Sequence, residues 1–214
     1  MASNIGQFSK YSFLTLGSQF IVLTVSVVTS IITARVLGPE GKGQLVLILL
    51  IPLLSLTFGK FGIGHAVNYY ASRVSSTKLI LNGLVLSVIS GLLLLLLLIP
   101  TITILKGVFF EGISKKNLIV ISFAVPFYLL TNFLTVLLQG LYKINRMNFL
   151  MIVQPVIYLF FVIIFVGTRK MGVDGAILAW VITLLIAFSL SILIVIKEFR
   201  SDVISLKIDF PIMR

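Results

Sequence analysis

The sequence has no cysteine and only one histidine among its 214 residues. The missing thiols exclude disulfide bonds, thiolate metal sites and cysteine nucleophiles. Charged residues are also scarce, at 11% of the chain against about a quarter in a typical soluble domain, and the mean hydropathy is +1.19. Because so few charges cannot cover a globular surface, we expect the lipid bilayer to be the solvent for most of the chain.

Acidic side chains are absent from every long apolar stretch. The six acids fall in predicted loops or in the C-terminal segment: Glu40, Glu111, Asp174, Glu198, Asp202 and Asp209. The spans therefore lack the carboxylates needed for three kinds of chemistry within the membrane: hydrolysis by paired carboxylates, binding of divalent metals and a proton relay. The single histidine, His65, has no acid clearly beside it for a catalytic triad. We expect no enzyme activity, no metal and no cofactor.

What the chain does contain is a series of apolar stretches long enough to cross a bilayer, which takes about 20 helical residues. The predicted spans are residues 13–34, 44–64, 79–104, 118–141, 149–167 and 173–196. The first is too long for a signal peptide and no convincing cleavage site follows it, so we interpret it as a retained helix. The sequence predicts an all-α polytopic membrane protein, with six transmembrane helices in residues 1–196 and an amphipathic tail or the start of a linker in residues 197–214.

Proline and glycine interrupt these spans at particular places. Pro52, Pro100, Pro126 and Pro155 each remove a backbone donor, so kinked and closely packed helices are expected. The segment 58–64 has glycine at three of its seven positions. These small residues allow close helix packing, the interpretation we favour, or a local break in the helix.

Two predicted turns resemble each other. Residues 37–43 read Leu-Gly-Pro-Glu-Gly-Lys-Gly, and residues 171–176 read Met-Gly-Val-Asp-Gly-Ala. Each places an acid, Glu40 or Asp174, beside the start of the following helix, where a negative charge complements the helix dipole. The glycines permit the turn. We expect a structural role for both segments.

Basic residues exceed acidic ones by eleven, and their distribution bears on the orientation of the chain. With the N-terminus inside, ten basic residues lie near the inner ends of the spans and seven near the outer ends. Four of the inner ones belong to residues 197–214, so the bias depends on that segment. We expect both termini to be cytoplasmic.

Positive charge remains within the predicted membrane region. Lys60 lies about 24 Å along the second span, counted from Gln44 at about 1.5 Å per residue. A charge at the centre of a bilayer costs roughly 2.5–3.5 kcal/mol. Either the long side chain of Lys60 carries its ammonium group to the inner headgroups, or Lys60 lines a polar cavity and attracts a negative ligand.

Other polar side chains within the spans have structural and functional interpretations. A polar stripe follows Lys60 at helical three- and four-residue spacing and consists of His65, Asn68, Tyr69 and Ser72, extended by Arg73. Such a stripe is more often a helix interface than a ligand site. Asn132, Gln139 and Gln154 either form hydrogen bonds between helices, the role we favour, or face a cavity. Arg35 and Lys42 flank the first turn, where anchoring at the membrane interface is the favoured role.

Several motifs, taken in order along the chain, resemble one family of transporters. They are Leu16-Gly-Ser-Gln19, Ala34-Arg-Val-Leu-Gly-Pro-Glu-Gly-Lys-Gly43, Phe61-Gly-Ile-Gly-His-Ala-Val-Asn-Tyr-Tyr70, Gln139-Gly-Leu141 with Asn148, and Gly172-Val-Asp-Gly-Ala176. Together they look like the opening of polysaccharide-transport flippases of the multidrug/oligosaccharidyl-lipid/polysaccharide exporter superfamily. Members of that family move undecaprenyl-pyrophosphate-linked sugars across bacterial inner membranes.

The resemblance implies two six-helix lobes that face each other across a central cavity, of which this chain supplies one. The second lobe would belong to the same full-length chain or to a homodimer partner. The resemblance also implies a cationic cavity for a lipid pyrophosphate, with the candidate substrate-binding residues Lys60, His65, Asn68 and Arg73, and Arg35 behind them. The expected partners are a lipid-linked anionic oligosaccharide and membrane lipids, with no nucleic acid, in the bacterial plasma membrane.

Two alternatives stay open. The drug-export branch of the superfamily often carries an Asp in its first helix for cation coupling, but residues 13–34 contain no acid. A cation-coupled multidrug exporter would therefore need an acidic site outside this chain. The other alternative is a membrane assembly subunit that transports nothing and whose cations only hold anionic lipids.

Overall fold

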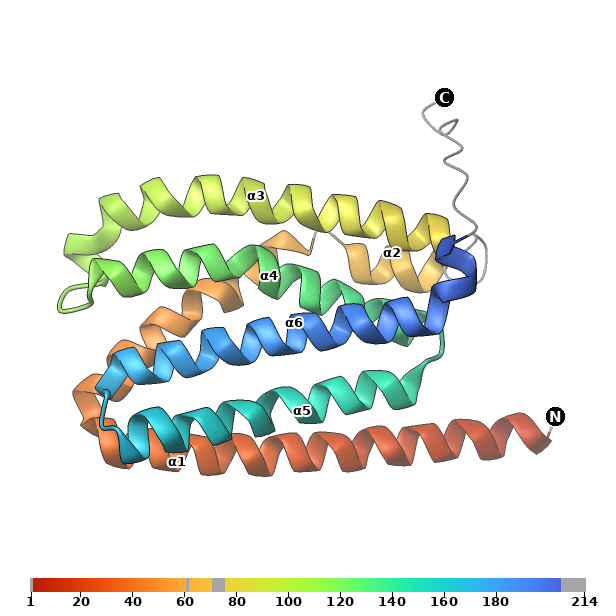
Figure 1. Cartoon of the computed structure of the whole chain (residues 1–214), viewed down its shortest axis with the longest axis horizontal. Helices are drawn as coiled ribbons and strands as arrows, with labels where there is room; N and C mark the ends of the chain where they lie inside the picture. Colours follow the sequence, from red (N-terminus) through yellow and green to blue (C-terminus); the bar gives the residue numbers. More distant parts are fainter. Residues whose placement is uncertain (1, 61, 71–75, 205–214) are drawn as a thin grey trace.

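The computed structural model describes residues 2–60, 62–70 and 76–204, and every regular element in these ranges is a helix. The elements are α1 (Ala2–Gly59), α2 (Ile63–Tyr70), α3 (Ser76–Phe109), α4 (Lys115–Gly140), α5 (Ile144–Val162), the π-helical η1 (Ile163–Thr168) and α6 (Gly172–Ile204). The expected all-α class is confirmed (Figure 1).

The helix α1 crosses the membrane region twice. Its apolar part, Phe13–Gly59, has 47 residues, which at about 1.5 Å per residue is about 70 Å, more than twice the hydrocarbon thickness. Gly38 lies inside it with non-helical angles, φ 70° and ψ 179°, and the chain doubles back at the end of the bundle (Figure 1). We call residues 2–37 the first arm and residues 39–59 the second arm. Within the described ranges, five helices are long and apolar enough to span a membrane, and because α1 doubles back they supply the six passes expected.

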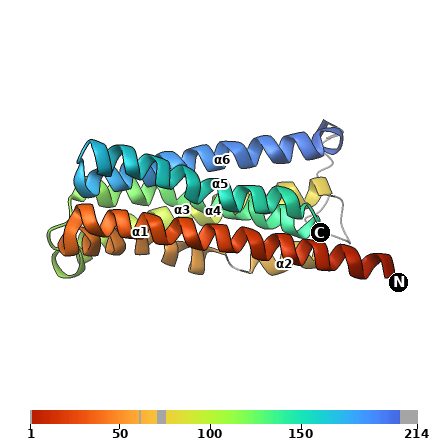
Figure 2. The same cartoon turned by 90° about the horizontal axis from the view of Figure 1, so that it is seen from below.

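The long helices lie side by side along one direction (Figures 1 and 2). The first arm of α1 lies against α5, while α3 lies on the other side of the bundle against α4 (Figure 1). Of the long helices, α4 is the most buried, and it contacts all the others. The outer surface is strongly apolar, as lipid contact requires, with Phe13, Leu96 and Ile104 each more than 70% exposed. The start of α1 and the end of α6 lie at the same end of the bundle (Figure 1).

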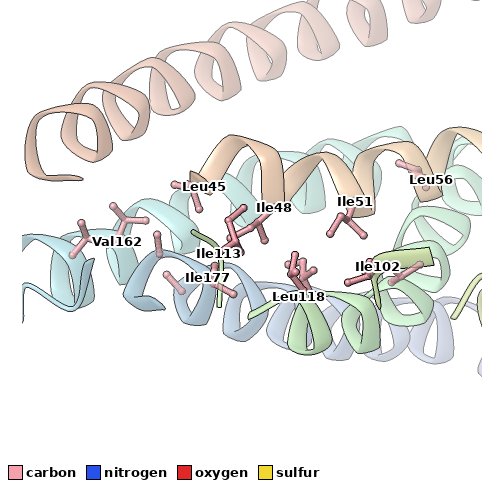
Figure 3. Close-up of a cluster of buried hydrophobic side chains, with 14 of the residues drawn as sticks. Leu45, Ile48, Ile51, Leu56, Ile102, Ile113, Leu118, Val162 and Ile177 are labelled. Atoms are coloured by element: carbon pink, nitrogen blue, oxygen red, sulfur yellow. The ribbon is translucent and has the colours of Figure 1, made fainter. Parts of the chain in front are cut away.

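Two clusters of buried apolar side chains hold the bundle together. The first gathers the second arm of α1 with α4, α5 and α6, and Figure 3 shows Leu45 and Ile48 of that arm above Leu118 of α4. The second joins α4 to α2 and α6 through residues such as Phe133 and Val67. Lipid is as apolar as these side chains, so the clusters stabilise the fold by close van der Waals packing.

Glycines allow α3 and α4 to approach closely. A Cβ atom at Gly91 would lie 3.0 Å from the Cα atom of Pro126, and one at Gly83 would overlap the ring of Phe133. Pro126 lies inside α4, as Pro100 lies inside α3. The expectation of proline within closely packed helices is confirmed for this pair.

The two similar turns have the same backbone device. Gly38 and Gly172 both adopt positive φ, 70° and 64°, directly before a helical segment. Asp174 lies in the first turn of α6, where its Oδ1 atom accepts a hydrogen bond from Nδ2 of Asn117 at 2.6 Å. The predicted position of this acid at a helix start is confirmed. The turns also lie together, because a Cβ atom at Gly41 would be 3.5 Å from Cγ2 of Val173.

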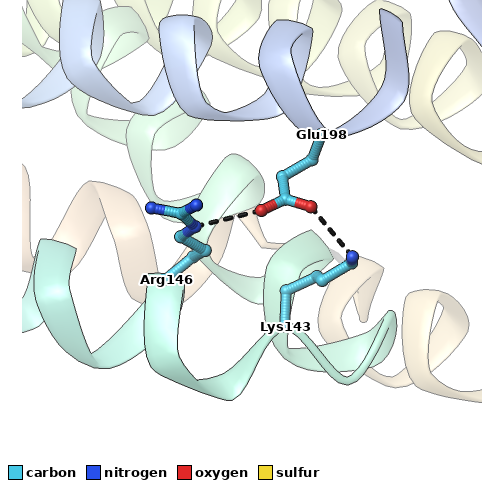
Figure 4. Close-up of polar contacts among 3 residues, drawn as sticks. All are labelled: Lys143, Arg146 and Glu198. Atoms are coloured by element: carbon cyan, nitrogen blue, oxygen red, sulfur yellow. Dashed lines mark hydrogen bonds and ion pairs between the residues drawn. The ribbon is translucent and has the colours of Figure 1, made fainter. Parts of the chain in front are cut away.

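The opposite end of the bundle carries a cluster of charges. The Oε2 atom of Glu198 on α6 lies 2.8 Å from Nζ of Lys143, and its Oε1 atom lies 3.0 Å from Nε of Arg146 (Figure 4). These pairs connect the start of α5 to the end of α6. The helix α6 extends past residue 196, where we placed the end of the lobe, and kinks at Phe199 (φ −117°, ψ 20°) before its last residues up to Ile204. The rest of the predicted tail, residues 205–214, lies outside the described residues.

Candidate functional site

The second predicted span, residues 44–64, is interrupted near its end, so the local break that we left open for segment 58–64 occurs. α1 ends at Gly59 and α2 begins at Ile63. Gly62 has φ 73°, a left-handed conformation that interrupts an α-helix and that glycine adopts at little cost. Close packing, which we favoured for this segment, also occurs: a Cβ atom at Gly59 would be 2.6 Å from Cδ1 of Leu94. The break lies part way along the bundle (Figure 1).

A pocket of about 560 Å³ lies beside this break. Its walls come from the end of α1, from α2 and from the facing sides of α3 and α4. The lining residues are Leu56, Thr57, Phe58, Gly59, Lys60, Gly62, Gly64, His65, Ser87, Ser90, Leu129, Asn132, Phe133, Val136 and Gln139. Three of them are glycines, so part of the wall is bare backbone.

Two of the predicted site residues, Lys60 and His65, line the pocket together. The helix break separates them, so Lys60 lies on one side of it and His65, the first residue of the expected polar stripe, lies on the other. Lys60 is exposed, and its ammonium group has no hydrogen-bond or ion-pair partner among the described residues. None of the described residues that line the pocket is an acid. The ammonium group of Lys60 therefore gives the pocket a positive charge that no carboxylate in its wall neutralises.

Hydroxyl and amide groups complete the polar part of the wall. Asn132 and Gln139 of α4 line the pocket. Their side chains therefore form part of the pocket wall and are not confined to hydrogen bonds between helices. Ser87 and Ser90 of α3 line it as well, and the sequence reasoning missed them. The signal available was their three-residue spacing, which puts two hydroxyls on one side of an otherwise apolar helix. This wall offers hydrogen bonds to a polar ligand.

The remaining candidates do not join this group in the described structure. Arg35 lies on the first arm of α1, three residues before the reversal at Gly38, and does not line the pocket. Asn68 belongs to α2, but its side chain is outside the described part, and Arg73 is outside it altogether. Lys42, expected as an interfacial anchor, donates a hydrogen bond from Nζ to Oγ1 of Thr33 at 2.7 Å.

A second, smaller pocket of about 140 Å³ lies between α4, α5 and α6. Its polar lining residues include Thr131, Asn132 and Gln154. Asn132 lines both pockets, so α4 separates them. Within the described ranges, no group of three or more His, Asp or Glu side chains is placed to hold a metal ion.

Comparisons with solved structures identify the fold. Over 91% of its length the chain matches an outward-facing multidrug resistance MATE family transporter of the MOP superfamily, with a TM-score of 0.73 and 19% identity. Over 94% it matches a MOP superfamily transporter from Pyrococcus furiosus for which a reverse polarity of the binding pocket suggests a different function, with a TM-score of 0.66 and 17% identity. The chain spans less than half of these transporters, 45% and 46% of their lengths. At this identity the likeness shows the fold, which is that of one lobe.

Sequence comparison identifies the family. No curated protein matches the chain significantly. A family model described as polysaccharide biosynthesis protein, however, matches residues 8–211, nearly the whole sequence. The motifs that suggested a polysaccharide transporter fall within this match, so the predicted resemblance is confirmed at the level of the family. The chain belongs to the polysaccharide biosynthesis protein family and has the fold of one lobe of a MOP superfamily transporter.

Proposed function

We propose that this chain is a flippase lobe that moves a polyprenyl-pyrophosphate-linked oligosaccharide across the bacterial plasma membrane for surface polysaccharide synthesis. The observation that carries the proposal is the pocket at the helix break. It combines Lys60 with hydroxyl and amide groups and has no acid among its described lining residues. A lipid pyrophosphate is an anion joined to a sugar, and this wall offers a cation for the first and hydrogen bonds for the second.

The proposed mechanism is alternating access between two lobes. The pyrophosphate and sugar enter the polar pocket while the prenyl chain stays in lipid. The lobe then rocks against a second lobe, supplied by the same full-length chain or by a homodimer partner, and the polar groups become accessible from the other side. The lobe makes and breaks no bond in this scheme and needs no cofactor. Both termini are cytoplasmic, in keeping with the start of α1 and the end of α6 at one end of the bundle (Figure 1).

An export assay with cation variants tests this function. The full-length protein is expressed in bacteria that lack their own flippase, and surface polysaccharide is measured against the amount of protein in the membrane. Lys60→Ala combined with Arg73→Ala is expected to abolish most export, because the pyrophosphate loses its cations. Lys115→Ala combined with Arg169→Ala removes two exposed charges away from the pocket and is the control, with export expected near the parent level.

The alternatives give different results in the same cells. Full export by the Lys60 and Arg73 variant would overturn the site, and it is the result expected of an assembly subunit that transports nothing. A cation-coupled multidrug exporter predicts drug resistance and drug-dependent proton flux in place of polysaccharide. The described acids all lie at helix ends, at the reversal of α1 or in loops, which favours the flippase over such an exporter; they are Glu40, Glu111, Asp174, Glu198 and Asp202.

A further inference from the structure

The backbone at the helix break has hydrogen-bond donors without acceptors. The first backbone hydrogen bond of α2 runs from the N–H group of Ala66 to the carbonyl of Gly62, at 3.0 Å. The N–H groups of Ile63, Gly64 and His65 precede it and have no hydrogen-bond partner within the described residues. At a helix start exposed to water, such N–H groups bind solvent. Here they lie at a break inside the membrane part of the bundle (Figure 1).

Two of the three residues that carry these donors, Gly64 and His65, line the pocket, and Ile63 lies directly before them. Gly62 and Gly64 both line it, and glycine can line a pocket only with backbone atoms. A Cβ atom at Gly62 would meet nothing within 4 Å, so the side of the backbone where a side chain would project is open. His65, the third residue of α2, lines the pocket too, and Lys60 lies on the other side of the break. Free N–H groups at a helix start together with a nearby ammonium group favour an anion.

A buried hydroxyl on the opposite wall is also unpartnered. Nearly all the other Ser and Thr side chains in the described spans with a recorded hydrogen bond donate to the carbonyl three or four residues earlier, as Ser90 does to Ser87 at 3.1 Å. Ser87 is 1% exposed and its Oγ atom has no partner, which makes it the single buried hydroxyl of this kind in the described chain. A buried polar group without a partner costs free energy, and such a group in a pocket wall indicates that a ligand completes it.

From these observations we infer that the backbone N–H groups of Ile63, Gly64 and His65 form a phosphate subsite with the Ser87 hydroxyl. The inference rests on the proposed function and specifies how the pyrophosphate is held. Lys60 supplies the charge, while the backbone donors and Ser87 fix the position of the phosphate oxygens. The helix break itself is therefore part of the binding site, and glycine is needed there both to end the helix and to leave its backbone accessible.

The test is binding of farnesyl pyrophosphate to the full-length protein in phosphatidylcholine nanodiscs, measured by calorimetry. Ile63→Pro removes one N–H group at the first position of a helix, where proline fits, and Ile63→Ala is its control because it shortens the side chain and keeps the N–H group. Ser87→Ala removes the free hydroxyl, and Ser90→Ala is its control because that hydroxyl is already bonded. Lys60→Gln reports the contribution of charge alone.

We expect Ile63→Pro and Ser87→Ala each to weaken binding about tenfold or more, since each loses a hydrogen bond to a charged group. The two controls should stay within about twofold of the parent. Farnesol, which lacks phosphate, should bind far more weakly, and inorganic pyrophosphate should compete better than a short-chain phosphatidylglycerol. Thermal unfolding shows whether the Ile63→Pro variant folds. If it does not fold, binding by Ser87→Ala alone tests the subsite.

The outcomes separate the subsite from the function. Parent-like binding by Ser87→Ala, with weak binding by Lys60→Gln, would overturn the subsite and leave the proposed function standing. No binding of farnesyl pyrophosphate by the parent would overturn both. Equal competition by phosphatidylglycerol would show a site for ordinary lipid headgroups and overturn the assignment to pyrophosphate.

Discussion

Two glycines interrupt the N-terminal part of the chain, and they differ in what surrounds them. Gly38 turns α1 back at the end of the bundle, and the cation that follows is engaged, because Lys42 donates to the hydroxyl of Thr33 at 2.7 Å. Gly62 breaks the second pass part way along the bundle (Figure 1), and the ammonium group of the neighbouring Lys60 has no partner in the described structure. The first interruption reverses the chain, whereas the second opens a pocket.

A glycine close to a lysine in the sequence therefore has no single structural role. After the first interruption the second arm enters the apolar cluster at once, with Leu45 and Ile48 almost fully buried (Figure 3). At the second, one side of the chain packs against Leu94 and Leu129 while the other faces the pocket. A polar group that the fold satisfies is structural, and one that it leaves open is a candidate for a ligand.

The largest expected effect tests the reversal at Gly38. With φ 70° and ψ 179° this residue lies in a region that only glycine occupies readily. Gly38→Val should therefore destabilise the protein by about 1–3 kcal/mol, seen as a lower unfolding temperature in detergent. Gly43→Ala is the matched control, because Gly43 is helical and its Cβ would meet nothing within 4 Å. Equal stability of the two variants would contradict the reversal as described.

Most of the fold could be predicted from the sequence. Spans of about 20 apolar residues are read directly from composition, because lipid demands continuous helices of that length. The reversal at residues 37–43 was predictable as well, since glycine and proline stand together there between two spans. Glycine content alone did not predict whether the helix would break at Gly62. A run of small residues permits either packing or a break, and the choice depends on α3 and α4, which pack against it.

The site was less predictable than the fold. Lys60 stood out because an intramembrane charge is costly, and it does line a pocket. Ser87 did not stand out, because most serines in membrane helices donate to their own backbone and only the structure shows which one does not. The use of Lys60 and Ser87 for substrate stays a prediction. Arg35 was grouped with Lys60 through the family resemblance, but it lies on the first arm of α1 and does not line the pocket.

A smaller loss of stability is expected when a methyl group is added at the glycines beside the second interruption. A Cβ atom at Gly59 would be 2.6 Å from Cδ1 of Leu94 and 3.0 Å from Cδ2 of Leu129. These methyl groups can shift only partly, so Gly59→Ala should cost about 1–2 kcal/mol in unfolding free energy. At Gly64 the nearest atom, Cγ1 of Val136, would be at an ordinary 3.6 Å, and Gly64→Ala should be close to neutral. Denaturation of both variants in parallel checks the order, and the reverse order would rule out close packing at Gly59.

The smallest stability effects separate the two lysines. Lys42→Met loses the bond to the Thr33 hydroxyl, which still donates to a carbonyl of its own helix, so a cost of about 1 kcal/mol is expected. Lys60→Met loses no bond that the described structure contains and removes a charge from membrane depth, so its stability should be unchanged or higher. Export should show the opposite order, near normal for Lys42→Met and strongly reduced for Lys60→Met. Unfolding temperature and export measured on the same preparations give the comparison, and a Lys60→Met protein that is unstable yet fully active would make Lys60 the structural cation of the pair.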